Sequence, residues 1–201
     1  MSDSFRKSVW LLLLIVTLLA GGCGSQTFNG TQYDPPRPAP ELAGTNWDGS
    51  DFAVEDLKGT VALVFFGYTF CPDICPMSLA NMRQVYDALP DGQEDISVVF
   101  VSVDPERDTP DRLAQYIPAF HEDFYGVYVP EPALAAVKQG YGVYAEKNFP
   151  DADESSIDYL VDHTGWIYVI DKKGNLRLAF SHTAPVEEIV PDVEQLLKER
   201  G

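Results

Sequence analysis

Residues 61–77 constrain the fold of this chain more than any other stretch, because they place two cysteines where a buried strand turns into a helix. Residues 61–66 read V-A-L-V-F-F, an apolar run with the length and composition of a strand buried on both faces. Cys71 and Cys75 follow in a turn, and Pro76 comes directly after the second cysteine. Proline suits the first turn of a helix, where its missing N–H costs nothing. The stretch therefore predicts a strand, a turn with two thiols and a helix.

This order is the active-site layout of thioredoxin-like folds, but the cysteine spacing here is C-x-x-x-C rather than C-x-x-C. The extra residue lets the two sulfurs diverge enough to bind one soft metal ion from two sides. Thiolates select Cu(I) or Zn, and an imidazole would be a natural third ligand. A redox couple, a simple disulfide and two inert buried thiols are the alternatives. The prolines after Cys71 and Cys75 and the strand-to-helix turn argue against inert thiols.

The composition fits a globular domain and excludes some partners. The chain has 201 residues, of which 45% are hydrophobic and 22% charged, which suits one domain with a substantial core. Fourteen basic and 31 acidic residues give a net charge of −17. Such acidity disfavours nucleic acid and polybasic contact with a membrane surface. It would suit a basic partner or a cation, although acidity commonly serves solubility alone.

The N-terminus carries a targeting signal. Arg6 and Lys7 precede an apolar run over 9–20, and the small residues A-G-G then lead to Cys23, which together are typical of a secretory signal. Cys23 matches the lipidated cysteine of a bacterial lipobox, although Ala20 replaces the usual leucine. An uncleaved anchor helix is the alternative, short for a full span. Either would tether the domain to the extracytoplasmic side of the cell membrane.

The domain organisation follows from this signal. Residues 1–23 form the signal or anchor, residues 24–40 end in P-P-R-P-A-P and predict a flexible linker, and residues 41–201 form the exported domain. That domain keeps only Cys71 and Cys75. Because an oxidising compartment tends to join free thiols, the pair is a redox couple, a metal site or a bridge. A disulfide across so short a loop would add little stability through chain entropy, so a functional pair is the better interpretation.

The remaining elements predict an α/β fold, specifically a thioredoxin-like sandwich with an N-terminal β-hairpin and a C-terminal β-hairpin plus helix. Thr109 and Pro110 are typical of a helix start, and K-K-G-N of a tight turn. In chain order we expect a hairpin over 42–57, a helix over 76–89, a strand over 96–103, a helix over 110–120, a strand over 125–129, a helix over 132–140, a strand over 141–149, strands over 159–171 and 176–181, and a helix over 185–200.

One histidine is a candidate third ligand. His163 lies at the entrance to an apolar strand, which in a thioredoxin-like sheet faces the cysteine turn. Thioredoxin-like oxidoreductases have a cis-proline at this edge, whereas no proline occurs over 158–171. Asp162 could orient the imidazole. A surface histidine at a strand end is the alternative. His121, beside two acidic residues, is expected to be solvated, and His182 is ambiguous.

Four motifs together resemble the Sco/SenC family of copper proteins. They are G-Y-T-F-C-P-D-I-C-P at 67–76, V-S-V-D-P-E-R-D-T-P at 101–110, V-D-H-T at 161–164 and the hairpin I-Y-V-I-D-K-K-G-N-L. They extend over most of residues 41–200, and the combination is highly specific. We assign no part of the family resemblance to the acidic loop at 151–154.

The resemblance implies a thioredoxin-like domain that binds copper through Cys71, Cys75 and His163. Family members help to assemble the copper site (CuA) of cytochrome c oxidase subunit II, by delivering copper or by keeping the target thiols reduced. The implied partners are that subunit or another cuproprotein, and a copper donor protein. Two thiolates and one imidazole suit Cu(I), and with an added ligand also Cu(II). Asp73 and Asp162 are candidates for residues that surround the site without ligating.

Two functions therefore remain. The first is a membrane-tethered copper chaperone, which is not an enzyme. The second is a thiol–disulfide oxidoreductase that uses Cys71 and Cys75, and the two activities can coexist because thiols must be reduced before copper binds. The wide cysteine spacing and His163 favour the first function. Substitution of His163 separates them, since a carrier should lose copper whereas a reductase should keep much of its thiol exchange.

Overall fold

A computed structural model describes residues 27–149 and 158–201. The targeting segment with Cys23 and the acidic loop at 151–154 lie outside these residues. Among the described residues, no helix is both long enough and apolar enough to cross a membrane.

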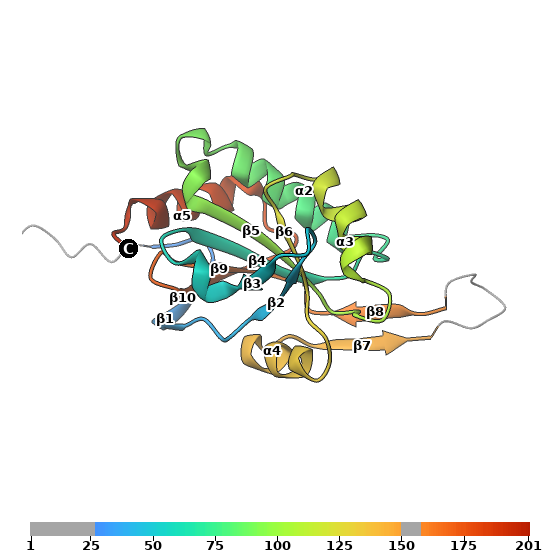
Figure 1. Cartoon of the computed structure of the whole chain (residues 1–201). Helices are drawn as coiled ribbons and strands as arrows, with labels where there is room; N and C mark the ends of the chain where they lie inside the picture. Colours follow the sequence, from blue (N-terminus) through green and yellow to red (C-terminus); the bar gives the residue numbers. More distant parts are fainter. Residues whose placement is uncertain (1–26, 150–157) are drawn as a thin grey trace, which may run out of the picture.

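Within this part of the chain, the core is a sheet of eight strands in the order β1-β10-β9-β4-β5-β6-β2-β3, and a separate sheet pairs β7 with β8 (Figure 1). The strands are β1 (Thr31–Pro38), β2 (Ala43–Asn46), β3 (Asp51–Ala53), β4 (Val61–Gly67), β5 (Ile96–Ser102), β6 (Tyr125–Tyr128), β7 (Ala145–Asn148), β8 (Leu160–His163), β9 (Trp166–Ile170) and β10 (Asn175–Ser181). The α-helices are α2 (Ile74–Asp87), α3 (Pro110–Tyr116), α4 (Ala133–Tyr141) and α5 (Val186–Lys198), and the 3-10 helices are η1 (Val54–Leu57), η2 (Pro90–Asp95) and η3 (Ile117–Ala119).

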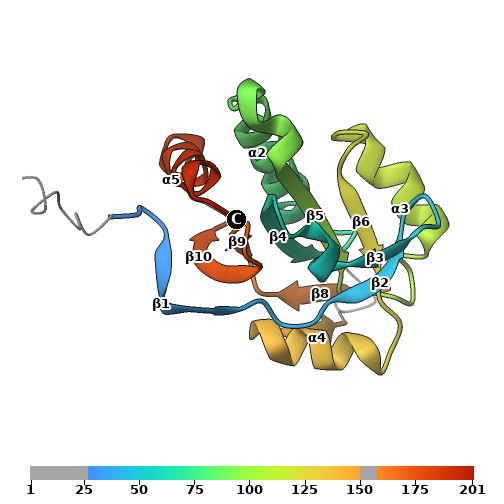
Figure 2. The same ribbon diagram turned by 60° about the vertical axis from the view of Figure 1, so that its left-hand side comes forward.

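Strand β4 lies at the centre of the large sheet, parallel to β5 and antiparallel to β9. Every residue of β4 and β5 is buried, because α2 and α5 cover one face of the sheet and α4 covers the other (Figure 2). Burial on both faces explains why both strands are continuous apolar runs. The predicted thioredoxin-like α/β sandwich with its two hairpins is confirmed: β2 pairs with β3, β9 pairs with β10, and α5 follows.

The predicted strand over 159–171 is wrong as a single element. The chain bends after His163, so that β8 pairs with β7 whereas β9 joins the large sheet. Gly165 permits the bend, since a Cβ there would lie 2.6 Å from Nδ1 of His182. The predicted strand over 141–149 is also shorter, because α4 extends to Tyr141 and Gly142 ends it with a φ of +70°.

The expected linker over 24–40 differs from the structure as well. Residues Thr31–Pro38 form β1, which pairs antiparallel with β10 at the edge of the large sheet. The backbone N–H groups of Asn29 and Gly30 donate to the buried carboxylate of Asp192 at 2.8 and 2.9 Å. An edge strand tolerates proline; Pro35 and Pro36 lie in the register shift between Gln32 and Arg37, and Pro38 lies at the end of the strand, opposite Asn175. Residues 29–38 therefore belong to the domain.

Candidate metal centre

The two cysteines lie where β4 passes into α2. The N–H of Cys71 donates to the carbonyl of Tyr68 at 3.2 Å, which closes the turn. Helix α2 begins at Ile74, two residues earlier than predicted, so Cys75 lies inside its first turn. As a result Cys75 is fully buried, whereas Cys71 is half-buried. The turn therefore presents one accessible sulfur and one enclosed sulfur.

The third residue of the cluster is His163, the last residue of β8. Its Nε2 lies 3.3 Å from Sγ of Cys75, and the donor atoms of Cys71, Cys75 and His163 all lie within 4.8 Å of one another. Sequence reasoning placed this histidine opposite the cysteine turn, and the structure brings the three side chains together. Among the described residues, no other Cys, His, Asp or Glu joins this group.

The imidazole is held in an orientation that suits metal binding. Nδ1 of His163 lies 3.2 Å from the carbonyl of Thr164, and because a carbonyl only accepts, Nδ1 carries the proton. Nε2 of the neutral ring then has a free lone pair that faces the sulfurs. The rings of Tyr68 and Phe65 pack edgewise on the imidazole, with centroids 5.7 and 6.0 Å away. The carbonyl and the two rings fix the ligand before any metal arrives.

The two aspartates that were predicted to surround the site are both exposed. Asp162 is exposed and its carboxylate accepts from the side chain of Asn148 at 3.2 Å, so Thr164 rather than Asp162 orients the imidazole. The alternation of β8 explains this, because neighbouring residues of a strand point to opposite faces. Asp73 is also exposed, and it contributes its backbone N–H to the sulfur of Cys71.

The two thiols have opposite electrostatic environments. A hydrogen bond from the thiol of Cys75 is the largest effect that lowers the pKa of Cys71, to about 3, against the effect of burial. Burial is the largest effect that raises the pKa of Cys75, followed by its hydrogen bond to Cys71. The reduced pair therefore holds one thiolate and one thiol at neutral pH. A metal bound by both sulfurs would release the remaining proton.

Gly67, the last residue of β4, makes room for the enclosed sulfur. A Cβ at this position would lie 2.7 Å from Sγ of Cys75 and 2.9 Å from ring atoms of both Phe65 and Phe100. Atoms at such distances overlap, so only glycine lets the sulfur approach the strand this closely.

A buried carboxylate behind the turn was missed by sequence reasoning. Asp108 is fully buried and accepts from the N–H of Thr69 at 2.9 Å, from its hydroxyl at 2.6 Å, and from the hydroxyl of Ser102 at 2.8 Å. Burial raises the pKa of Asp108, whereas these three bonds lower it. They fix the turn two residues before Cys71. The motif D-P-E-R-D-T-P directly after a buried strand was the available signal.

The other two histidines lie outside the cluster. The prediction that His121 is solvated is wrong: its side chain is 18% exposed and its ring packs on those of Tyr86 and Phe124, with centroids 4.8 and 5.2 Å away. His182 bonds through its backbone N–H to the carbonyl of Gly165 at 2.8 Å, at the turn between β8 and β9.

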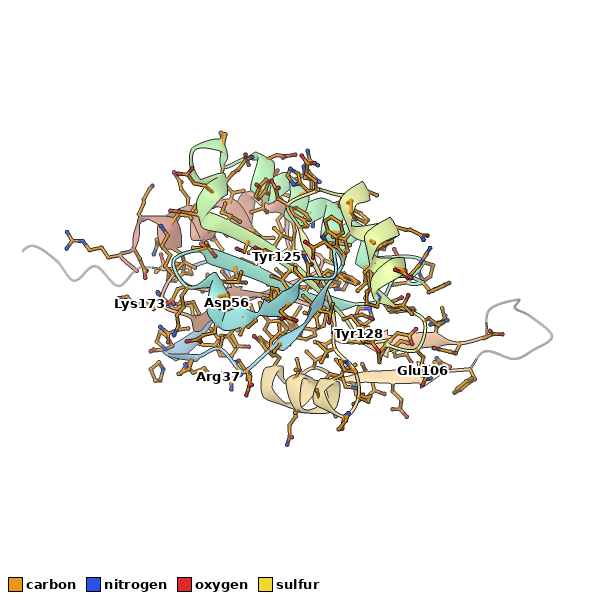
Figure 3. All side chains as sticks on the ribbon, viewed as in Figure 1. Arg37, Asp56, Glu106, Tyr125, Tyr128 and Lys173 are labelled. Atoms are coloured by element: carbon orange, nitrogen blue, oxygen red, sulfur yellow. The ribbon has the colours of Figure 1, made fainter. Side chains whose placement is uncertain are left out.

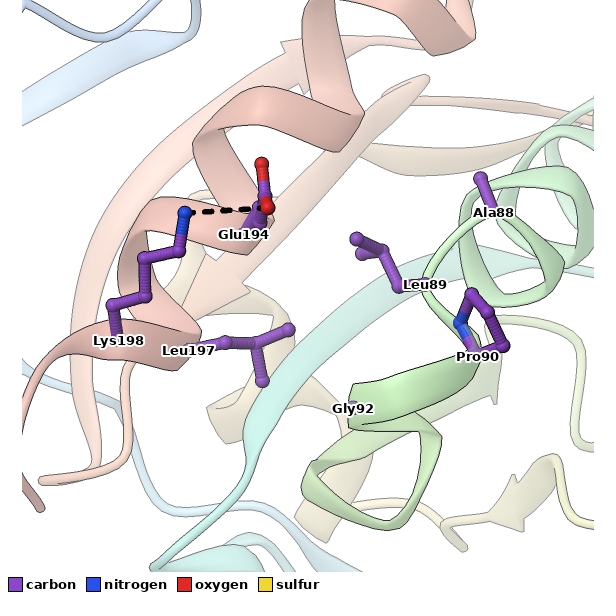
Figure 4. A pocket seen from close by; sticks show the side chains of 7 residues that line it. All are labelled: Ala88, Leu89, Pro90, Gly92, Glu194, Leu197 and Lys198. Atoms are coloured by element: carbon purple, nitrogen blue, oxygen red, sulfur yellow. Dashed lines mark ion pairs between the residues drawn. The ribbon is translucent and has the colours of Figure 1, made fainter.

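A pocket at the opposite end of α2 has no comparable chemistry (Figure 4). It lies between the C-terminal ends of α2 and α5, and its lining is mostly aliphatic. The residues that line it are Ala88, Leu89, Pro90, Gly92, Glu194, Leu197 and Lys198.

Known proteins are similar to this chain over most of its length. The SCO1/SenC family model matches residues 33–198. An SCO2-like protein of Rickettsia felis is 37% identical over 144 residues, which are 71% of this chain and 69% of the relative.

Two solved structures are similar over nearly their whole length. The copper-bound structure of ScoI from Bradyrhizobium japonicum is 34% identical with a TM-score of 0.70, and the match covers 79% of this chain and 99% of that one. The solution structure of apo Sco1 from Thermus thermophilus is 35% identical with a TM-score of 0.74, over 87% of this chain and 99% of that one. The chain therefore belongs to the SCO1/SenC family.

Proposed function

We propose that this protein is a membrane-tethered copper carrier that binds one copper ion through Cys71, Cys75 and His163. The observation that supports the proposal best is the cluster of two sulfurs and one imidazole nitrogen within 4.8 Å. This set matches the preference of Cu(I) for soft sulfur and few ligands, and a closed four-ligand zinc site would need one more donor. The related ScoI of Bradyrhizobium japonicum, whose structure has copper bound, supports the choice of metal.

The different exposure of the two sulfurs suits loading and release. The half-buried thiolate of Cys71 is the first donor that an incoming copper ion meets. Cys75 then loses its proton and His163, already oriented by Thr164, completes the ligand set. Release follows the reverse order, since a thiolate of the recipient can replace Cys71 from the open side.

The recipient that we propose is cytochrome c oxidase subunit II, during maturation of its CuA site, with a separate protein as the copper donor. Support comes from the family to which the chain belongs and from the resemblance of its motifs. We further propose that lipidated Cys23, or an uncleaved N-terminal anchor, holds the domain at the extracytoplasmic face of the cell membrane.

A second candidate is a thiol–disulfide reductase, and the lowered pKa of Cys71 favours it. The thiolate of Cys71 would attack a disulfide of the target and form a mixed disulfide. Cys75 would lose its proton and attack Cys71, which leaves a Cys71–Cys75 disulfide and a reduced target. Such a step could prepare the thiols of the copper recipient.

One experiment separates the two candidates. The reduced protein and its His163→Ala variant are loaded with copper, and the metal content is measured beside the rate of thiol exchange with a glutathione buffer. A carrier binds one copper ion per chain and holds it more weakly when the imidazole is removed. If neither protein retains copper while both exchange thiols readily, the reductase is the correct function.

A further inference from the structure

The ligand His163 lies on an element that needs an anchor. Strands β7 and β8 form a two-stranded sheet that projects beyond the main sheet (Figure 1). An isolated two-stranded hairpin is marginally stable in water, so contacts at its base must hold it against the cysteine turn. We propose that Arg107 is the positioning residue that holds the hairpin there and thereby strengthens the binding of Cu(II) more than that of Cu(I). The proposal rests on the copper-carrier function above.

Arg107 contacts three segments at once. Its Nη1 donates to the carbonyl of Tyr159, the residue before β8, at 2.9 Å, and its guanidinium lies 3.6 Å from the centre of the Tyr159 ring. Its Nε donates to Asp104, in the loop after β5, at 2.5 Å. The same guanidinium lies 5.7 Å from the ring of Tyr68 and 4.8 Å from that of Phe70, both in the cysteine turn. One side chain therefore joins the hairpin base to the turn.

Further contacts make this junction rigid. The hydroxyl of Tyr159 donates to Asp104 at 2.8 Å, and Lys147 of β7 lies 4.4 Å from the centre of the Tyr159 ring. Lys147 also pairs with Glu106 at 2.6 Å, and Figure 3 shows Glu106 beside the hairpin. The side chain of Arg107 is 17% exposed and that of Asp104 is fully buried, so removal of the guanidinium leaves a buried charge without its partner.

The position of Tyr159 controls that of His163. Only three residues of β8 separate them, and an extended strand transmits a displacement along its length. Tyr68 provides a second link, because its ring contacts both Arg107 and the imidazole. The sulfurs are also held by contacts that do not involve Arg107, namely those of Gly67 and Asp108. Loss of Arg107 should therefore displace the imidazole and leave the two thiols in place.

This selective effect discriminates between the two oxidation states of copper. Two thiolates already satisfy Cu(I), which is soft and accepts few ligands, whereas Cu(II) depends on nitrogen and oxygen ligands. A loosened imidazole should weaken Cu(II) binding far more than Cu(I) binding. Removal of residues that orient a metal ligand typically reduces affinity by about 10- to 100-fold.

The test measures both affinities in the full chain with the variant Arg107→Gln. Cu(I) and Cu(II) are titrated separately against chelators of known affinity. We expect the Kd for Cu(II) to rise by about 10- to 100-fold and the Kd for Cu(I) to change by less than about threefold. Arg37→Gln is the matched control, since Arg37 also lies over a tyrosine ring, 5.1 Å from Tyr33, but on β1 (Figure 3). Both affinities of this control should equal those of the unaltered chain.

A double variant distinguishes positioning from a general structural effect. If Arg107 acts through His163, then Arg107→Gln added to His163→Ala should weaken Cu(II) binding no further. Equal losses for both copper ions, or an additional loss in the double variant, would overturn the proposal. If Arg107→Gln does not fold, Tyr159→Phe removes only the hydroxyl contact with Asp104 and should weaken Cu(II) selectively, to a smaller degree.

The failure of the inference and that of the proposed function are separate outcomes. An unaltered chain that binds no copper would refute the carrier function and with it the role of Arg107. An unaltered chain that binds copper through His163, together with an Arg107→Gln variant of unchanged Cu(II) affinity, would refute the role of Arg107 alone.

Discussion

Substitution of Gly67 by alanine should damage the metal centre through steric pressure alone. The new Cβ would lie 2.7 Å from Sγ of Cys75, and ordinary contact begins near 3.4 Å, so the sulfur must move by about 0.7 Å. Metal–ligand distances in a working site hold within about 0.2 Å, so this displacement is too large for a copper–sulfur bond to persist unchanged. The new Cβ would also lie 2.9 Å from ring atoms of Phe65 and Phe100, so the strand cannot relieve the clash without displacing these rings as well.

The same crowding should lower stability. Overpacking of a well-packed core costs about 1–3 kcal/mol, and three contacts below 3.0 Å place Gly67→Ala near the upper end. Urea unfolding of the reduced, metal-free protein measures this loss, and competition with a Cu(I) chelator measures affinity. Gly92→Ala is the control, because its Cβ meets only the tip of Leu197, at 3.1 Å. A Gly67→Ala protein with unchanged stability and copper affinity would refute the steric argument.

Three further predictions concern the thiols, the buried carboxylate and the bound metal. Since the pKa of Cys71 is about 3, its thiolate persists as the pH falls, and the rate of its alkylation by iodoacetamide should stay flat from pH 8 to pH 5. The alkylation rate of an ordinary thiol falls by about tenfold per pH unit over this range. A steep fall for Cys71 would contradict the presence of the thiolate. Asp108→Ala leaves three buried donor groups without an acceptor and should lower the free energy of unfolding by about 3 kcal/mol, whereas Asp111→Ala, at an exposed neighbour, should change it little in urea titrations. Copper at 100 times its Kd should raise the free energy of unfolding by about 2.7 kcal/mol, and calorimetry should show that a chelator reverses the gain.

Local sequence signals predicted the parts of the fold that depend on local physics. The apolar run of β4 followed by proline after Cys75 predicted the strand, the turn and the helix. Thr109 accepts from the N–H of Arg112 at 3.3 Å and Pro110 begins α3, as expected of a helix start. His163 was found because the expected fold placed the strand over 159–171 beside β4, and β9, which begins three residues after His163, does pair with β4.

The parts that were missed depend on contacts between distant segments. The prolines of 31–38 indicate a linker when only their neighbours are considered, yet the free edge of β10 accommodates them as a strand. His121 stands beside acidic residues in the sequence, but aromatic rings from α2 and from the chain before β6 enclose it. The roles of Arg107 and Asp108 depend on partners up to 52 residues away, which no local pattern contains.

The most direct measurement of the proposed copper site is X-ray absorption on the Cu(I)-loaded protein and on its His163→Ala variant. The unaltered protein should show one copper ion with two sulfur neighbours near 2.3 Å, as for other thiolate-bound metals, and one nitrogen neighbour near 2.0 Å. The variant should keep both sulfurs and lose the nitrogen. A copper ion with the same neighbours in both proteins, or with fewer than two sulfurs in the unaltered one, would contradict a site built from Cys71, Cys75 and His163.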